Sequence, residues 1–113
     1  VDNASGVAAV LTLVGRVREA GLDRDVIFLF TGAEEWGLLG AAAFAANPPV
    51  PLASIVAGFN LDMIAVAPAG VPVSIVAERG SPLIPLVHAS GRALGRPLDN
   101  DDDAAAFLER QDG

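Results

Sequence analysis

The stretch "VIFLFTGAEEWGLLG", residues 26–40, joins a run of apolar β-formers to two adjacent glutamates and a glycine-rich turn. The run Val26–Thr31 has no polar residue before its final threonine, which is typical of a parallel strand covered on both faces. Apolar residues resume over Leu38–Ala46, and the asparagine and two prolines that follow favour a helix ending there. This stretch therefore predicts a strand, a turn that carries two carboxylates, and a helix.

The same alternation of elements extends in both directions. Apolar residues recur at helical spacing through Ser5–Ala20, with Asn3 or Ser5 able to cap the helix start and Gly21 behind its last turn. Three more predicted elements are buried strands over Ser54–Ile64 and Val71–Ala77, and a helix from Ser81 to about Leu94. Helices that alternate with such strands predict an α/β fold, a three-layer α/β/α arrangement around a largely parallel (mixed) sheet.

Composition limits the classes of partner. The 113 residues are 52% hydrophobic, which suffices for one modest domain, and there is no cysteine for disulfides or thiolate metal sites. Seven arginines against fourteen acidic residues give a net charge of −7, which argues against nucleic acid and anionic membranes as partners. No apolar run approaches the ~20 residues that span a bilayer. The sequence starts without methionine, so we interpret residues 1–113 as part of a single domain truncated at both ends.

Four carboxylates fall at element ends on this outline. Asp2 precedes the first helix, Glu34 and Glu35 follow the strand Val26–Thr31, and Asp62 lies near the end of the next strand. Ligands of open α/β sheets bind outside the carboxyl ends of the strands. The four side chains are therefore candidates to share one crevice.

Four carboxylates in one crevice would repel one another unless their negative charge is neutralised. Each like-charge pair at ~4 Å costs on the order of 4 kcal/mol at an effective dielectric of 20. No arginine or lysine occurs between Asp25 and Arg79, which leaves protonation or bound cations. Zinc suits carboxylate ligands, and a paired zinc site uses several of them, so the pattern suggests a metal pocket.

Simpler interpretations exist for each acid. Thr31 and Glu34 have the spacing of a capping box, and two acids at a helix start complement its dipole. Asp2 has the place of an N-terminal helix cap, and Asp62 that of a solvated strand end. Local sequence alone leaves these alternatives open.

Three strings taken in order resemble one family. "DNASG" (residues 2–6), "AEEWGLLG" (33–40) and "NLDM" (60–63) are similar to motifs of the co-catalytic dizinc exopeptidases, which include bacterial leucyl aminopeptidases, aminopeptidase Y and the glutamate carboxypeptidase II catalytic domain. The resemblance covers about the first 65 residues well. It implies the zinc-exopeptidase (phosphorylase/hydrolase-like) fold and an aminopeptidase that hydrolyses N-terminal peptide bonds with a metal-bridged water. It also implies a peptide or aminoacyl substrate and, by family habit, a secreted or periplasmic location.

The resemblance also implies roles for the four acids. Asp2 matches the carboxylate that bridges two zinc ions, and its peptide bond to Asn3 is usually cis in relatives. Glu34 matches the general base, Glu35 a ligand of one zinc and Asp62 a ligand of the other.

Two histidine ligands of the family pattern have no match here. One would lie upstream of Asp2, and "RQDG" (residues 110–113) places Gly113 where the second belongs. A non-catalytic module with the peptidase fold is therefore an alternative, and a glutaminyl cyclase-like enzyme with one zinc is another.

The remaining chemistry-bearing residues favour structural roles. His88 lies in the middle of a predicted helix, where we expect packing or a surface position. Asp99–Asp103 lacks the glycine and glutamate of a calcium loop and is expected to be a solvated loop. Trp36 either lines a substrate cleft or packs against the fold.

Overall fold

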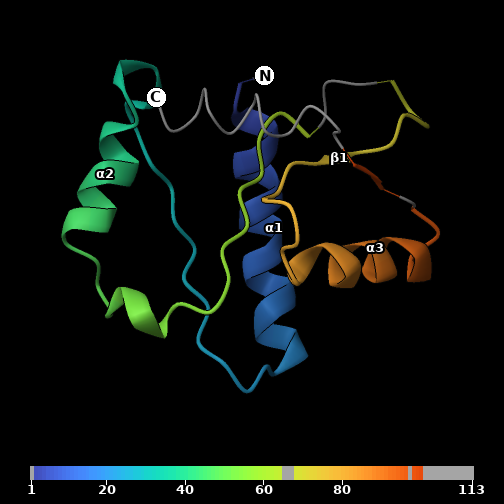
Figure 1. Cartoon of the computed structure of the whole chain (residues 1–113), viewed down its shortest axis with the longest axis horizontal. Helices are drawn as coiled ribbons and strands as arrows, with labels where there is room; N and C mark the ends of the chain where they lie inside the picture. Colours follow the sequence, from blue (N-terminus) through green and yellow to red (C-terminus); the bar gives the residue numbers. More distant parts are fainter. Residues whose placement is uncertain (1, 65–67, 97, 101–113) are drawn as a thin grey trace. The chain divides into compact units, whose positions relative to one another are not determined.

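The computed structural model describes residues 2–64, 68–96 and 98–100, and the chain has two compact units, Val1–Val66 and Ala67–Gly113 (Figure 1). The first unit contains α1 (Ala4–Ala20), the 3-10 turn η1 (Glu34–Trp36), α2 (Leu39–Ala46) and the 3-10 turn η2 (Leu52–Ser54). The second contains β1 (Ser74–Ile75), α3 (Leu83–Ala93) and β2 (Asp99–Asn100). None of the helices in the described residues is long and apolar enough to cross a membrane.

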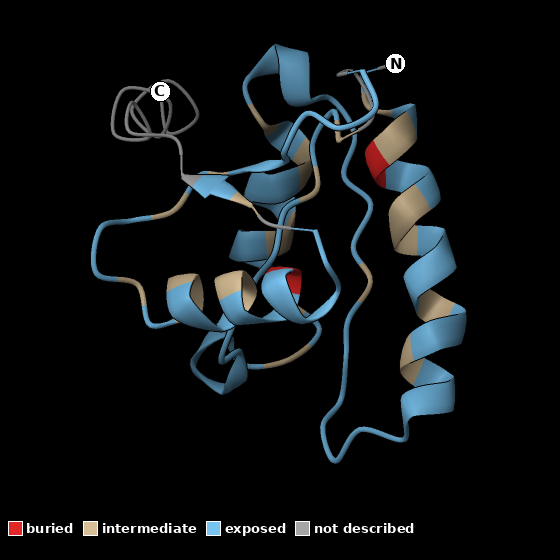
Figure 2. Cartoon of the chain, turned by 90° about the vertical axis from the view of Figure 1, so that its right-hand side faces the viewer, coloured by how far each residue is buried: buried red, intermediate tan, exposed pale blue. Residues whose placement is uncertain are grey.

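Helix α1 confirms the prediction made from its spacing and its end signals. The Asn3 side chain caps its start by accepting a hydrogen bond from the Gly6 amide, and Gly21 ends it in a left-handed conformation with φ 59°. Three valines of the predicted apolar stripe are half-buried along one side of the helix, at positions 10, 14 and 17 (Figure 2). Local capping and periodicity therefore fix this helix.

The predicted strands of the first unit do not form a ladder within the described residues. Val26–Thr31 and Ser54–Ile64 contain no strand residues, and they are largely exposed, with Phe28, Leu61 and Ile64 half-buried. Both segments follow extended traces in Figure 1, apart from the short turn η2. A strand needs a neighbour to satisfy its backbone groups, and no hydrophobic side chain of the described residues is fully buried. The three-layer fold thus stays a prediction.

The described residues of the second unit contain one pair of parallel strands, which are connected through a helix. β1 pairs with β2 in the register Ser74 to Asp99 and Ile75 to Asn100, so the predicted strand over Val71–Ala77 is reduced to two residues. The loop prediction for Asp99 is wrong, because this residue belongs to β2, while residues 101–103 lie outside the described residues. Parallel pairing requires a crossover connection, and α3 supplies it.

Helix α3 lies within the range predicted for it, from Ser81 to about Leu94, which confirms the prediction. The Ser81 hydroxyl accepts a hydrogen bond from the Leu83 amide at 3.3 Å, and Gly95 follows the helix at φ 65°. His88 lies within this helix and is half-buried, as expected.

Candidate functional site

The first candidate ligand, Asp2, lies exposed immediately before α1. Its peptide bond to Asn3 is cis, as the family resemblance implies. The interpretation of Asp2 as a helix cap is wrong, because the side chain that caps α1 is that of Asn3. The Asp2 carboxylate is therefore not used by the helix start that follows it.

The Asn3 side chain connects this helix start to the segment that carries Asp62. Its Nδ2 donates a hydrogen bond to the Leu61 carbonyl at 2.8 Å, and its Oδ1 accepts one from the Met63 amide at 3.0 Å. The same Oδ1 accepts from the Gly6 amide at 3.0 Å. Since Asp62 stands between Leu61 and Met63, one amide side chain holds the backbone on both sides of a second candidate ligand. We call these five residues (3, 6 and 61–63) the Asn3 junction.

The close contacts of the Asn3 junction require that residue 6 has no side chain. Gly6 is buried, and a Cβ atom built on it would collide with the Leu61 carbonyl oxygen and lie 2.5 Å from Asn3 Oδ1. This role of Gly6 was not predicted from the sequence. The signal was present, because a glycine in the first turn of an otherwise good helix is costly and usually has a packing reason.

The two glutamates lie on η1, a tight turn that is stabilised by backbone hydrogen bonds. The Glu34 carbonyl accepts hydrogen bonds from the amides of Gly37 at 3.0 Å and Leu38 at 2.9 Å, and both glutamates are exposed. The turn is capped by Ala33 without a side-chain hydrogen bond, so the capping-box interpretation of Thr31 and Glu34 is wrong. Neither carboxylate is engaged in capping, which leaves both for other chemistry.

A close backbone contact between Gly32 and Gly40 connects the segment that leads into this turn with α2. The Gly40 amide donates to the Gly32 carbonyl at 3.1 Å, and a Cβ atom on Gly40 would lie 2.6 Å from that same oxygen. Only glycine fits at position 40 without moving the backbone that leads into Glu34.

Within the described residues, three non-glycine residues adopt left-handed backbone conformations, and each lies in or next to a segment that carries a candidate site residue. Ala33 (φ 57°) precedes Glu34, Leu38 (φ 57°) closes the turn, and Met63 (φ 44°) follows Asp62. Such conformations cost of order 1–3 kcal/mol each and cluster at active sites and ligand clamps. Their position at both candidate segments is consistent with a functional role.

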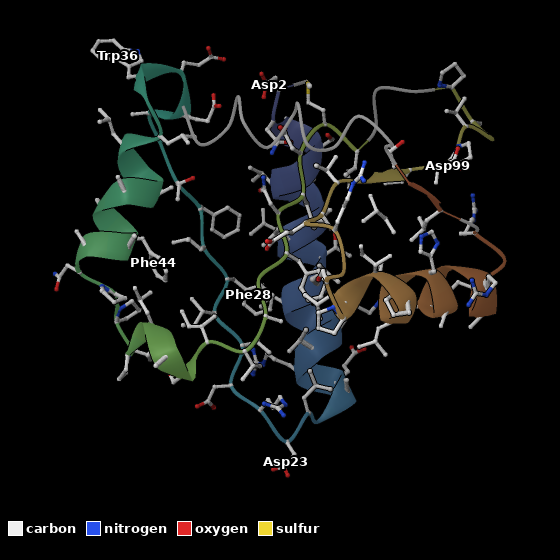
Figure 3. The ribbon with its side chains drawn as sticks, viewed as in Figure 1. Asp2, Asp23, Phe28, Trp36, Phe44 and Asp99 are labelled. Carbon is white, nitrogen blue, oxygen red and sulfur yellow. The ribbon has the colours of Figure 1, made fainter. Side chains whose placement is uncertain are left out.

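The described residues bring together only part of the predicted ligand set. Among them, no three His, Asp or Glu side chains are grouped closely enough to hold a metal ion. Asp2 and Trp36, which directly follows Glu35, both lie toward the top of the view in Figure 3. Trp36 is 82% exposed, so it does not pack against the described part of the chain. Gly113 lies outside the described residues.

Comparisons with known proteins identify the family. The profile of peptidase family M28 matches residues 1–111. A vacuolar membrane protease of Candida glabrata (strain ATCC 2001 / BCRC 20586 / JCM 3761 / NBRC 0622 / NRRL Y-65 / CBS 138) is 43% identical over 47 residues, which are 42% of this chain and 5% of that protein. The chain thus spans only a small fraction of this curated relative, and no solved structure matches it significantly. Because the family match covers almost the whole sequence, the chain belongs to peptidase family M28, which confirms its resemblance to the co-catalytic zinc exopeptidases.

Proposed function

We propose that the protein carrying this chain is a zinc-dependent aminopeptidase, which removes N-terminal residues from peptides on a three-layer α/β/α fold. Membership of a peptidase family supports the hydrolytic activity. The observation that carries the assignment of the site is the Asn3 junction. It links Asp2 to Asp62, two candidate ligands that are 60 positions apart in the sequence, through one side chain.

The donor chemistry of the candidate residues fits zinc. Asp2, Glu35 and Asp62 supply carboxylate oxygens, which zinc accepts as ligands, and all three side chains are exposed. No arginine or lysine stands between Asp25 and Arg79 to neutralise Glu35 and Asp62. We assign these three residues to hold the metal, two ions in a complete site. Zinc, when bound, supplies a Lewis acid that activates water and polarises the scissile carbonyl.

Glu34 is the proposed general base. It is adjacent to Glu35 on η1, and neighbouring residues of a tight turn direct their side chains differently, so one carboxylate can bind metal while the other faces the substrate. Glu34 accepts the proton of the attacking water and returns it to the leaving amine. Ala33 and Leu38, both left-handed, fix the backbone of this turn.

The test separates metal binding from proton transfer. In the full-length protein, Glu34→Gln is expected to keep its zinc and lose about 10²–10⁴-fold in turnover of an aminoacyl-anilide, the usual contribution of a general base. Asp2→Ala is the matched ligand variant, and elemental analysis should show a lower zinc content for it. Undiminished turnover by Glu34→Gln would refute the role of Glu34.

A non-catalytic binding module with the M28 fold is the second candidate. Gly113 favours it, because it stands where the family pattern has a histidine and glycine has no side-chain ligand. Two tightly bound zinc ions in the full-length protein, together with anilide turnover, would exclude this candidate.

A further inference from the structure

We propose that Asn3 is a positioning residue, which sets the separation of Asp2 and Asp62 and thereby the zinc affinity of the site. This inference rests on the proposed function, because it takes Asp2 and Asp62 as metal ligands. Its basis is the placement of one side chain. Asn3 is bonded directly to Asp2, and its amide is hydrogen-bonded to the residues before and after Asp62, at 2.8 Å to the Leu61 carbonyl and 3.0 Å to the Met63 amide.

The chemistry of the junction requires an amide. Leu61 presents a carbonyl, which needs a donor, while Met63 and Gly6 present N–H groups, which need an acceptor. Asparagine offers an NH₂ group and a carbonyl oxygen on the same short side chain. The reversed amide orientation would place NH₂ against two N–H groups, so the network assigns Oδ1 and Nδ2 unambiguously.

The backbone around the amide leaves little freedom for it to move. Gly6 lies against both the Leu61 carbonyl oxygen and the Asn3 amide, so closely that even a methyl group would collide with them. Asn3 also contributes its backbone carbonyl, which accepts the Val7 amide at 3.1 Å in the first turn of α1. The start of α1 therefore acts as a fixed support for the segment 61–63.

The competing explanation is that Asn3 serves only as a helix cap. These two roles are separable, because the cap uses the single contact to Gly6 whereas positioning uses the contacts to Leu61 and Met63. Serine caps helices about as well as asparagine does. Its hydroxyl is too short to reproduce the reach of the amide to the residues around Asp62, so Asn3→Ser keeps the cap and removes the positioning contacts.

The experiment measures zinc affinity in the full-length protein by competition with a chromogenic chelator, with circular dichroism and thermal unfolding as checks on folding. Loss of a residue that orients a metal ligand typically lowers metal affinity by about 10–100-fold, and we expect this for Asn3→Ser. Gly6→Ala is a second variant that disturbs the junction without deleting a polar group, and we expect a loss of the same order. The matched control is Gly21→Ala, which disturbs the opposite end of α1, has no atom within 4 Å of the added methyl group, and should leave zinc affinity unchanged.

The outcomes distinguish the inference from the proposed function. Wild-type zinc affinity in both Asn3→Ser and Gly6→Ala, with a reduced affinity in Asp2→Ala, would overturn the positioning role and leave the metal site intact. Equal losses in Asn3→Ser and Gly21→Ala would also overturn it, because the effect would then follow helix stability. A wild-type protein that binds no zinc would refute the proposed function itself. The double variant Asn3→Ser with Gly6→Ala should be no weaker than the worse single variant, because both act on one junction.

Discussion

One methyl group placed at two positions of the same helix should have opposite effects on stability. Gly6 and Gly15 both lie in α1, but a Cβ atom at Gly15 meets nothing within 4 Å, whereas one at Gly6 collides with the Leu61 carbonyl oxygen and lies 2.5 Å and 2.7 Å from the two polar atoms of the Asn3 amide. Gly15→Ala is expected to stabilise the protein by about 0.5–1 kcal/mol, because alanine loses less backbone entropy in a helix.

The expected effect of Gly6→Ala follows from the contacts that the methyl group displaces. Alanine gains the same helix propensity there, about 0.5–1 kcal/mol. Against this stand the contacts of Asn3 with Leu61 and Met63, each contributing a net ~0.5–1.5 kcal/mol. Overpacking of a tight site typically costs a further ~1–3 kcal/mol. We therefore expect a net loss of about 1–5.5 kcal/mol, opposite in sign to the effect at Gly15.

The measurement is urea-induced unfolding of the full-length protein, followed by circular dichroism. The midpoints of wild type and both variants report stability when the unfolding free energy has the same dependence on urea concentration in all three. Gly6→Ala should lower the midpoint and Gly15→Ala should raise it slightly. A Gly6→Ala variant as stable as Gly15→Ala would refute the close approach of Gly6, Asn3 and Leu61 described above.

Two further predictions concern the turn that carries the glutamates. Gly40→Ala should lower anilide turnover and thermal stability, because its methyl group would lie 2.6 Å from the Gly32 carbonyl oxygen, while Gly58→Ala, with nothing within 4 Å, should change neither in the same assays. Equal behaviour of these two variants would contradict the tight packing of η1 on α2. Ala33 has φ 57°, so Ala33→Gly should be at least as stable as wild type and Ala33→Val less stable by about 1 kcal/mol or more, since a β-branched side chain suits the left-handed region poorly. A valine variant as stable as the glycine variant in thermal unfolding would contradict the backbone conformation given for Ala33.

The helices were predictable because their determinants are local. Asn3 and Gly21 end α1 as the sequence indicates, and the Ser81 hydroxyl accepts a hydrogen bond from the Leu83 amide, although Pro82 rather than Ser81 occupies the N-cap position of α3. The strands were harder, since a strand depends on partners that are remote in sequence and on the layers that cover it. Within the described part of the chain, only two residues of Val71–Ala77 pair in a strand ladder, and no residue of Val26–Thr31 does.

The residues of the candidate site could be predicted from the sequence, but the contacts that hold their backbone in place could not. Family motifs selected Asp2, Glu34, Glu35 and Asp62, and a capping box at Thr31 was inferred from spacing although Ala33 occupies the cap position. The Asn3 junction joins residues that are 58 and 60 positions apart. No local pattern indicates such a contact, because it depends on how the backbone returns to the start of α1.

The exposed run Val26–Phe30 has a consequence for the behaviour of the chain in solution. Its side chains at positions 26, 27, 29 and 30 are 43%, 45%, 47% and 49% exposed, and the run contains neither proline nor charge. Short segments of this composition stack readily into cross-β assemblies when nothing covers them. The apolar, uncharged side chains that suit this run to the centre of a sheet therefore also favour its self-association with the same run in other copies of the chain. Any preparation that leaves it uncovered is expected to begin aggregating at these residues.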